Sequence, residues 1–196
     1  MYHPEERITL PPYPYVGSRF FCSRGIWWRV IAADGNNRLI MTEGGYNSGN
    51  WANRRTAVTN WAAENLAPEL RAAMRAPGNV DFDENTISRP DGASTANDSV
   101  FILSRAEFTA YLGVTSLMEA RFARVRPTAI PELRPGDYMQ THFDPTQLIT
   151  SGDVRDWWLR ERPTTAGWGV MALHGLPGSL SLTSVTCVRP VLWISI

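Results

Sequence analysis

The first clear pattern along the chain is a pair of hydrophobic, β-branched and aromatic runs at 25–31 and 38–42. The turn Asp34-Gly35-Asn36-Asn37 separates them. Asp-Gly between two such runs is typical of a β-hairpin. We therefore expect an N-terminal hairpin, followed by a loop in the Gly- and Asn-rich segment 44–50.

From Thr56 the hydrophobic period changes to that of a helix. One face carries apolar or packing residues at helical spacing, namely Val58, Trp61, Ala62, Asn65 and Leu66. Pro68 then suits the first position of a second helical piece, because its missing N–H is not needed there. Leu70, Ala73 and Met74 continue an apolar face in that piece.

The rest of the chain alternates turn-rich and β-rich segments. Residues 77–99 predict a long surface loop and 100–103 a short buried strand. Ser104 with Glu107 forms the pattern of a capping box opening a helix through Tyr111, and Ser116 with Glu119 repeats it. Runs from 157 to the C-terminus predict an antiparallel β-meander. The fold class is thus α+β, with two to four helices.

Residues 1–15 form a Pro- and Tyr-rich arm before a single α+β domain at 16–196. Proline fixes φ and removes a donor, so the arm should be extended. It is either a ragged tail or an arm that contacts a protein partner or a second copy. In the second case Pro12, Tyr13 and Tyr15 are the expected oligomer contacts.

Composition narrows the function classes. Hydrophobic residues make up 43% and charged residues 19%, which predicts a folded domain. The formal net charge is zero, which argues against nucleic-acid or anionic-membrane binding. No apolar run is long enough for a transmembrane helix, and the start lacks a signal-peptide pattern. We expect cytoplasmic synthesis, with incorporation into a virion or exported particle as an alternative.

Tryptophan is abundant, with eight residues. Trp28, Trp61, Trp157 and Trp193 are the predicted core members, and alternation in the strand 157–160 should place Trp157 and Trp158 on opposite faces. Trp51, in a polar loop, and Trp168, between two glycines, are instead expected to expose a ring face. An exposed ring could stack on a sugar or anchor a protein contact. Packing over the hairpin is the alternative for both.

Signatures of catalysis are weak. His3, His142 and His174 lack metal-ligand spacing, and the acidic run at 81–85 lacks the glycine and the final carboxylate of a calcium loop. No nucleophile elbow, P-loop or dinucleotide motif is found. The sequence therefore predicts a non-enzyme with no metal and no cofactor, calcium-independent in any binding.

Four motifs occur in an order that resembles an uncharacterised bacterial and phage domain family. They are Trp28-Arg29-Val30, Phe101-Ile102-Leu103-Ser104, Trp157-Trp158-Leu159-Arg160 and Val188-Arg189-Pro190-Val191-Leu192-Trp193. The likeness spans about 16–196, but Glu161-Arg162-Pro163 departs from the family's Ser-Pro-Gly. That family is similar to the C-type-lectin-like superfamily. This second resemblance implies that the first and last strands pair, which would bring Cys22 and Cys187 close enough for a disulfide; two free thiols are the alternative.

The leading functional hypothesis is a non-catalytic recognition or architectural module, such as a receptor- or glycan-binding component of a phage or similar particle. Its loops at 44–55 and 161–170 would carry the ligand. The candidate ligand-binding residues are Trp51, Asn53, Trp168, Arg160 and Arg162. The arginines are alternatively buried structural tethers that hold loop carbonyls or pair with Glu43, Asp156 or Glu161. Two further alternatives are a small-ligand sensor or enzyme with an Arg-lined pocket, and an assembly subunit without a ligand.

Overall fold

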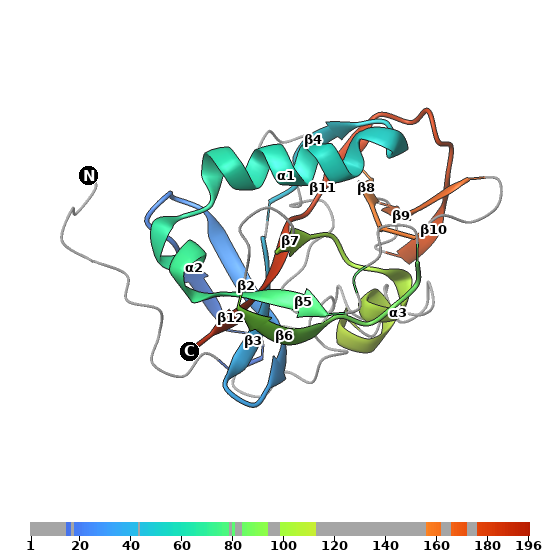
Figure 1. The fold of residues 1–196 in the computed structure, drawn as a ribbon. Helices are drawn as coiled ribbons and strands as arrows, with labels where there is room; N and C mark the ends of the chain where they lie inside the picture. Colours follow the sequence, from blue (N-terminus) through green and yellow to red (C-terminus); the bar gives the residue numbers. More distant parts are fainter. Residues whose placement is uncertain are drawn as a thin grey trace, which may run out of the picture.

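The computed structural model describes residues 15–16, 18–42, 44–78, 80, 84–93, 99–112, 156–161, 166–171 and 176–196. These residues form a mixed α+β fold with mostly antiparallel sheets and few helices (Figure 1). The predicted second capping box, Arg162 and all three histidines lie outside the described residues, as do Pro12 and Tyr13 of the arm.

The first sheet runs in the order β1-β2-β3-β12-β5-β6, and β7 also pairs with β12. Its strands are β1 (Arg19–Phe21), β2 (Trp27–Asp34), β3 (Asn37–Thr42), β5 (Met74–Gly78), β6 (Arg89–Ala93), β7 (Val100–Phe101) and β12 (Val191–Ser195). The predicted hairpin is confirmed as β2–β3, with Gly35 in its turn at φ 55°. The last strand is central, because β12 lies between β3 and the pair β5 and β7.

The second sheet runs in the order β10-β9-β8-β11-β4. Its strands are β4 (Tyr46–Gly49), β8 (Trp157–Trp158), β9 (Gly167–Met171), β10 (Leu176–Leu180) and β11 (Thr186–Val188). The predicted C-terminal meander holds only for β8, β9 and β10. The chain then returns, so that β11 pairs with β8 in parallel and with β4 antiparallel, and β12 joins the first sheet.

The helical segments lie between and beside the sheets. They are the 3₁₀ turn η1 (Trp51–Asn53), α1 (Arg54–Asn65), α2 (Pro68–Ala73), α3 (Arg105–Glu107) and the π-helical η2 (Phe108–Leu112). Pro68 stands at the start of α2, as predicted. The predicted loop at 77–99 is partly wrong, because β5 and β6 pair there. Pro77 and Pro90 face each other in that pair. Pro90 lies on the edge strand β6, and Pro77 lies beyond the two β5 residues that pair with β12, so both positions tolerate a missing donor.

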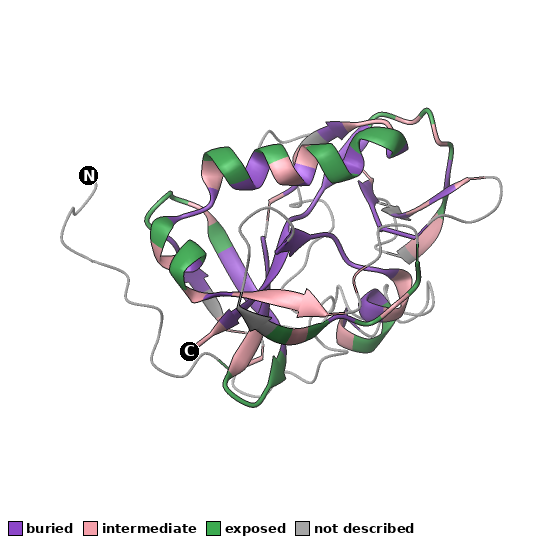
Figure 2. Cartoon of the chain, in the orientation of Figure 1, coloured by how far each residue is buried: buried purple, intermediate pink, exposed green. Residues whose placement is uncertain are grey.

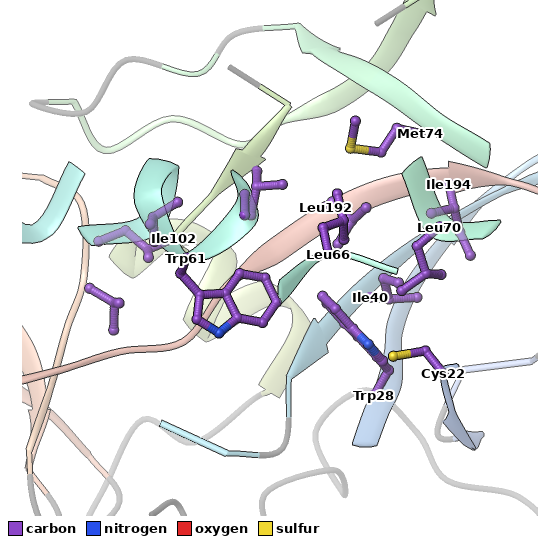
Figure 3. Packing of buried hydrophobic residues seen from close by; sticks show 14 of the residues in the cluster. Cys22, Trp28, Ile40, Trp61, Leu66, Leu70, Met74, Ile102, Leu192 and Ile194 are labelled. Carbon is purple, nitrogen blue, oxygen red and sulfur yellow. The ribbon is translucent and has the colours of Figure 1, made fainter. Parts of the chain in front are cut away.

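Both faces of the first sheet are covered, so its hydrophobic residues divide into two clusters. Ile40, Leu192 and Ile194 pack with α1 and α2 in the first cluster (Figure 3). Their neighbours Leu39 and Trp193 point the other way, into a second cluster with residues of η2 and β8. Strand alternation produces this division.

The four predicted core tryptophans, Trp28, Trp61, Trp157 and Trp193, are all buried, which confirms that prediction. Trp157 and Trp158 fall in different clusters, as the alternation predicted, and both are fully buried.

The implied pairing of the first and last strands is wrong for the strands that the structure describes. β1 pairs only with β2 at one edge of the sheet, whereas β12 lies near the centre. Cys22 and Cys187 accordingly belong to different hydrophobic clusters, and both are buried free thiols. The disulfide is therefore not formed.

Candidate functional site: a polar groove beside α1

A groove of about 430 Å³ lies between α1 and β4. Figure 1 shows α1 running beside β4, and the two elements are in contact. The groove is lined by Tyr46, Ser48, Asn53, Thr56, Ala57, Asn60, Trp61, Glu64 and Asn65. Most of these side chains are uncharged hydrogen-bonding groups, and Glu64 is the one charged side chain among them.

Helical spacing explains why these groups share one side of α1. Thr56, Asn60 and Glu64 are four residues apart, so they lie above one another on successive turns. All three are exposed, whereas Val58 and Ala62 on the opposite side are buried. Figure 2 shows this division along α1, with exposed residues outward and buried ones toward the sheet.

Two aromatic rings form the floor of the groove. The half-buried Tyr46 ring lies 5.0 Å from the Trp61 ring, and Trp61 meets Trp28 edge-on at 5.9 Å. Trp61 is 6% exposed, so the groove reaches only its edge. Burial raises the pKa of Tyr46 to about 12, which keeps its phenol neutral at physiological pH.

The mouth of the groove near β4 depends on Gly49. Gly49 has φ 69°, a conformation that favours glycine. A Cβ on Gly49 would lie 3.3 Å from the Asn53 amide nitrogen, so the glycine leaves room for that side chain. The Ser48 hydroxyl donates to the Thr186 carbonyl over 3.0 Å, which joins β4 to β11. The backbone beside the groove is thus held from both sides.

Sequence reasoning found one residue of this groove, Asn53, which is exposed and lines it. It missed Thr56, Asn60 and Glu64. Their four-residue spacing was a visible signal of a polar helical stripe. Their position beside β4 could not be seen in the sequence, because it depends on how the strand packs against the helix.

The other predicted ligand residues do not join Asn53 on one surface. Trp51 is 8% exposed, and the Arg54 guanidinium lies 3.4 Å from its ring centroid. The expected exposed face of Trp51 is therefore wrong. Trp168 is half-buried beneath Arg105, whose guanidinium carbon lies 4.4 Å from the ring centroid. Arg162 lies outside the described residues.

The glycines beside Trp168 have a packing role that differs from the expected one. A Cβ on Gly167 would overlap Cδ1 of Trp51 and lie 2.8 Å from Cζ3 of Trp158. A Cβ on Gly169 would lie 2.8 Å from the Trp157 carbonyl. Small residues are needed because β9 passes close to these groups. Since alternate strand residues face opposite ways, Trp51 and Trp168 lie on opposite faces of β9.

Arg160 is a buried structural residue rather than an exposed guanidinium group that could bind a ligand. Its Nη1 donates to Glu107 Oε2 over 2.6 Å, and both side chains are fully buried. Nη2 donates to the carbonyl and hydroxyl of Thr86. The predicted bond from Arg160 to loop carbonyls is thus confirmed, whereas its acidic partner is Glu107, which the sequence did not indicate. The expected partner Glu43 lies outside the described residues.

Glu107 is the residue through which the hydrogen bonds around Arg160 connect to other parts of the fold. It completes the predicted capping box with Ser104, which is confirmed. Its Oε1 accepts hydrogen bonds from the backbone and hydroxyl of Ser88, and the Trp193 indole donates to the same hydroxyl over 3.0 Å. The network joins the segment before β6, the start of α3, the segment after β8 and the central strand β12.

Other buried arginines also have protein partners. Arg189 donates through Nε to the Thr42 carbonyl over 3.0 Å. Arg54 donates through Nη2 to the Arg160 carbonyl over 2.8 Å. Neither lines the groove. The Arg189 contact ties the segment before β12 to β3, and the Arg54 contact ties α1 to the segment after β8, which favours the tether interpretation over an arginine ligand site.

In the part of the chain that the structure describes, no group of three or more His, Cys, Asp or Glu side chains is arranged to hold a metal ion. Among the same residues, no helix has the length and apolarity needed to cross a membrane. No family model, curated protein or solved structure matches the chain.

Proposed function

We propose that this chain is a non-catalytic recognition module that binds a macromolecular ligand in the groove between α1 and β4. The observation that carries the proposal is the set of exposed hydrogen-bonding side chains on one face of α1, beside a floor held by the buried core. Such a surface can donate and accept hydrogen bonds without rearranging the fold.

The resemblance to a bacterial and phage domain family supports a place on a virion or similar particle. The lectin-like part of that resemblance belongs to the same proposal.

Binding of the purified chain to intact bacterial cells from a panel of species tests the proposal. The informative variant is Thr56→Ala/Asn60→Ala, which removes two polar groups from the groove. The matched control is Asn36→Ala, which removes an exposed amide from the β2–β3 turn. Hydrogen bonds contribute about 1 kcal/mol each, so removing two should weaken saturable binding roughly thirtyfold in the groove variant alone.

Absence of binding to every species by the folded wild type would refute the proposal. Equal binding by the wild type and the groove variant would place the ligand elsewhere on the chain and would refute it too.

A second role in assembly is favoured by a separate observation. Tyr15 is 62% exposed and Trp27, at the start of β2, is 46% exposed. Exposed aromatic rings are common anchors in protein interfaces. A Tyr15→Ser/Trp27→Ser variant should then lower the molar mass measured by light scattering at high concentration. An unchanged mass would reject this role.

A further inference from the structure

The chemistry of the groove narrows the class of ligand. We infer that the groove binds an uncharged oligosaccharide, and that Glu64 selects against glycans carrying negative charge. This inference rests on the proposed function, since it names the ligand of the same groove.

The polar groups in the groove match sugar hydroxyls. Each Asn side chain offers both donors and an acceptor, and each Ser or Thr hydroxyl does the same. A sugar hydroxyl also donates and accepts, so it can satisfy such groups in pairs. Asn53, Asn60 and Asn65 contribute three amides, and the Asn65 nitrogen already donates to the Trp61 carbonyl over 3.1 Å.

The length of the groove suits several sugar units. Asn53, the N-cap residue of α1, and Glu64, in its last turn, are eleven positions apart. At 1.5 Å per residue the polar stripe between them is about 16 Å long. A single ring would occupy only part of this stripe, whereas a short linear oligosaccharide could contact all of it.

An extended peptide is the main competitor, and the groove favours it less. Peptide grooves of this size usually provide apolar pockets for alternate side chains. Here Ala57 and the edges of the Tyr46 and Trp61 rings are the apolar part of the lining. The exposed part is amide, hydroxyl and carboxylate, which fits a ligand rich in hydroxyls.

Charge supplies the selectivity. Glu64 is exposed and is the one charged side chain among the described residues that line the groove. Its oxygens can accept hydrogen bonds from sugar hydroxyls, but they repel a carboxylate or sulfate bound nearby. Two like charges at about 4 Å in water repel by about 1 kcal/mol, equivalent to about fivefold in affinity.

The first test separates the ligand class from the recognition function. Cells that bind the chain are treated either with periodate, which cleaves vicinal diols of sugars, or with a protease. We expect periodate to abolish groove-dependent binding and protease treatment to leave it intact. The reverse outcome would overturn the saccharide inference while the recognition function stands. Binding that survives both the periodate and the protease treatment would also overturn the saccharide inference.

The second test addresses Glu64. Affinities are measured for purified neutral oligosaccharides and for counterparts of the same length that contain uronic acid. The variant is Glu64→Gln, and the control is Glu84→Gln, an exposed carboxylate away from the groove. We expect Glu64→Gln to tighten binding of the uronate glycans about fivefold at low salt, and salt to reduce this gain.

Binding of the neutral glycans should change little in Glu64→Gln, because glutamine keeps the shape and an acceptor oxygen. Wild-type preference for the uronate glycans would overturn the selectivity. An equal effect of Glu84→Gln, or a gain insensitive to salt, would overturn the assignment of this role to Glu64.

Discussion

The buried Glu107–Arg160 pair offers the sharpest test of the structure. Glu107 receives hydrogen bonds from Ser88 and Ser104 as well as from Arg160, and both charged side chains are fully buried. Glu107→Gln keeps the shape of the side chain and removes its charge. The guanidinium of Arg160 then stays buried without its counter-ion.

The expected loss follows from the geometry. A carboxylate presents an acceptor to the Ser88 side and another to the Ser104 and Arg160 side, whereas an amide presents an acceptor to one side and a donor to the other. At least one group of donors therefore faces an NH₂. Breaking a buried ion pair by removing one partner costs about 3–5 kcal/mol. This is a large fraction of the roughly 5–15 kcal/mol stability of a typical domain.

Urea unfolding followed by tryptophan fluorescence and circular dichroism measures the loss. The control Glu84→Gln changes an exposed residue in the same part of the chain and should stay within about 0.5 kcal/mol of wild type. A double-mutant cycle with Arg160→Met should show a coupling above about 1 kcal/mol. A loss below about 1 kcal/mol for Glu107→Gln, or additive effects in the cycle, would refute the network.

Three further substitutions test other parts of the fold. Burial alone would raise the pKa of Glu69, but hydrogen bonds from the Ser23 backbone and hydroxyl outweigh it and lower the pKa below its ordinary value. Because its pKa is lower in the folded protein, ionised Glu69 stabilises the fold at pH values above the pKa of the unfolded chain, and this contribution is lost as the pH falls. The difference in Tm between wild type and Glu69→Gln should therefore shrink from neutral pH to about pH 3. Gly167→Ala should cost about 1–3 kcal/mol in urea unfolding, because its Cβ would overlap the Trp51 ring; an unchanged midpoint would contradict the close packing of β9. Trp61→Ala should lose about 3–5 kcal/mol by the same assay, and a loss under 1 kcal/mol would mean that the ring is not a core member.

Features set by residues close in sequence were predictable from the chain. The capping box of Ser104 and Glu107 involves residues three apart, and its geometry follows from the start of the helix itself. The alternation of Trp157 and Trp158 follows from the strand period. Packing against neighbours only had to preserve these local preferences.

Features set by distant residues were not predictable in the same way. The sequence indicated that a buried Arg160 would bond to loop carbonyls or to an acidic residue, but Glu107 lies 53 positions away and its approach depends on how the start of α3 packs against the segment after β8. The glycines around Trp168 have the same origin, since the groups that require them, the rings of Trp51 and Trp158 for Gly167 and the Trp157 carbonyl for Gly169, belong to η1 and β8. The parallel return of β11 beside β8 likewise depends on sheet assembly.

The two sides of α1 allow stability and binding to be separated. Trp61 is both a core residue and part of the groove floor, so any change there alters fold and groove together. Asn60 is exposed in the middle of the helix, and alanine is a better helix former than asparagine by about half a kcal/mol. Asn60→Ala should therefore raise stability slightly while it weakens ligand binding. If Asn60 served only the fold, its replacement would not raise stability and weaken binding together. Measuring both stability and binding in Asn60→Ala therefore distinguishes a ligand-binding face from a face that only contacts solvent.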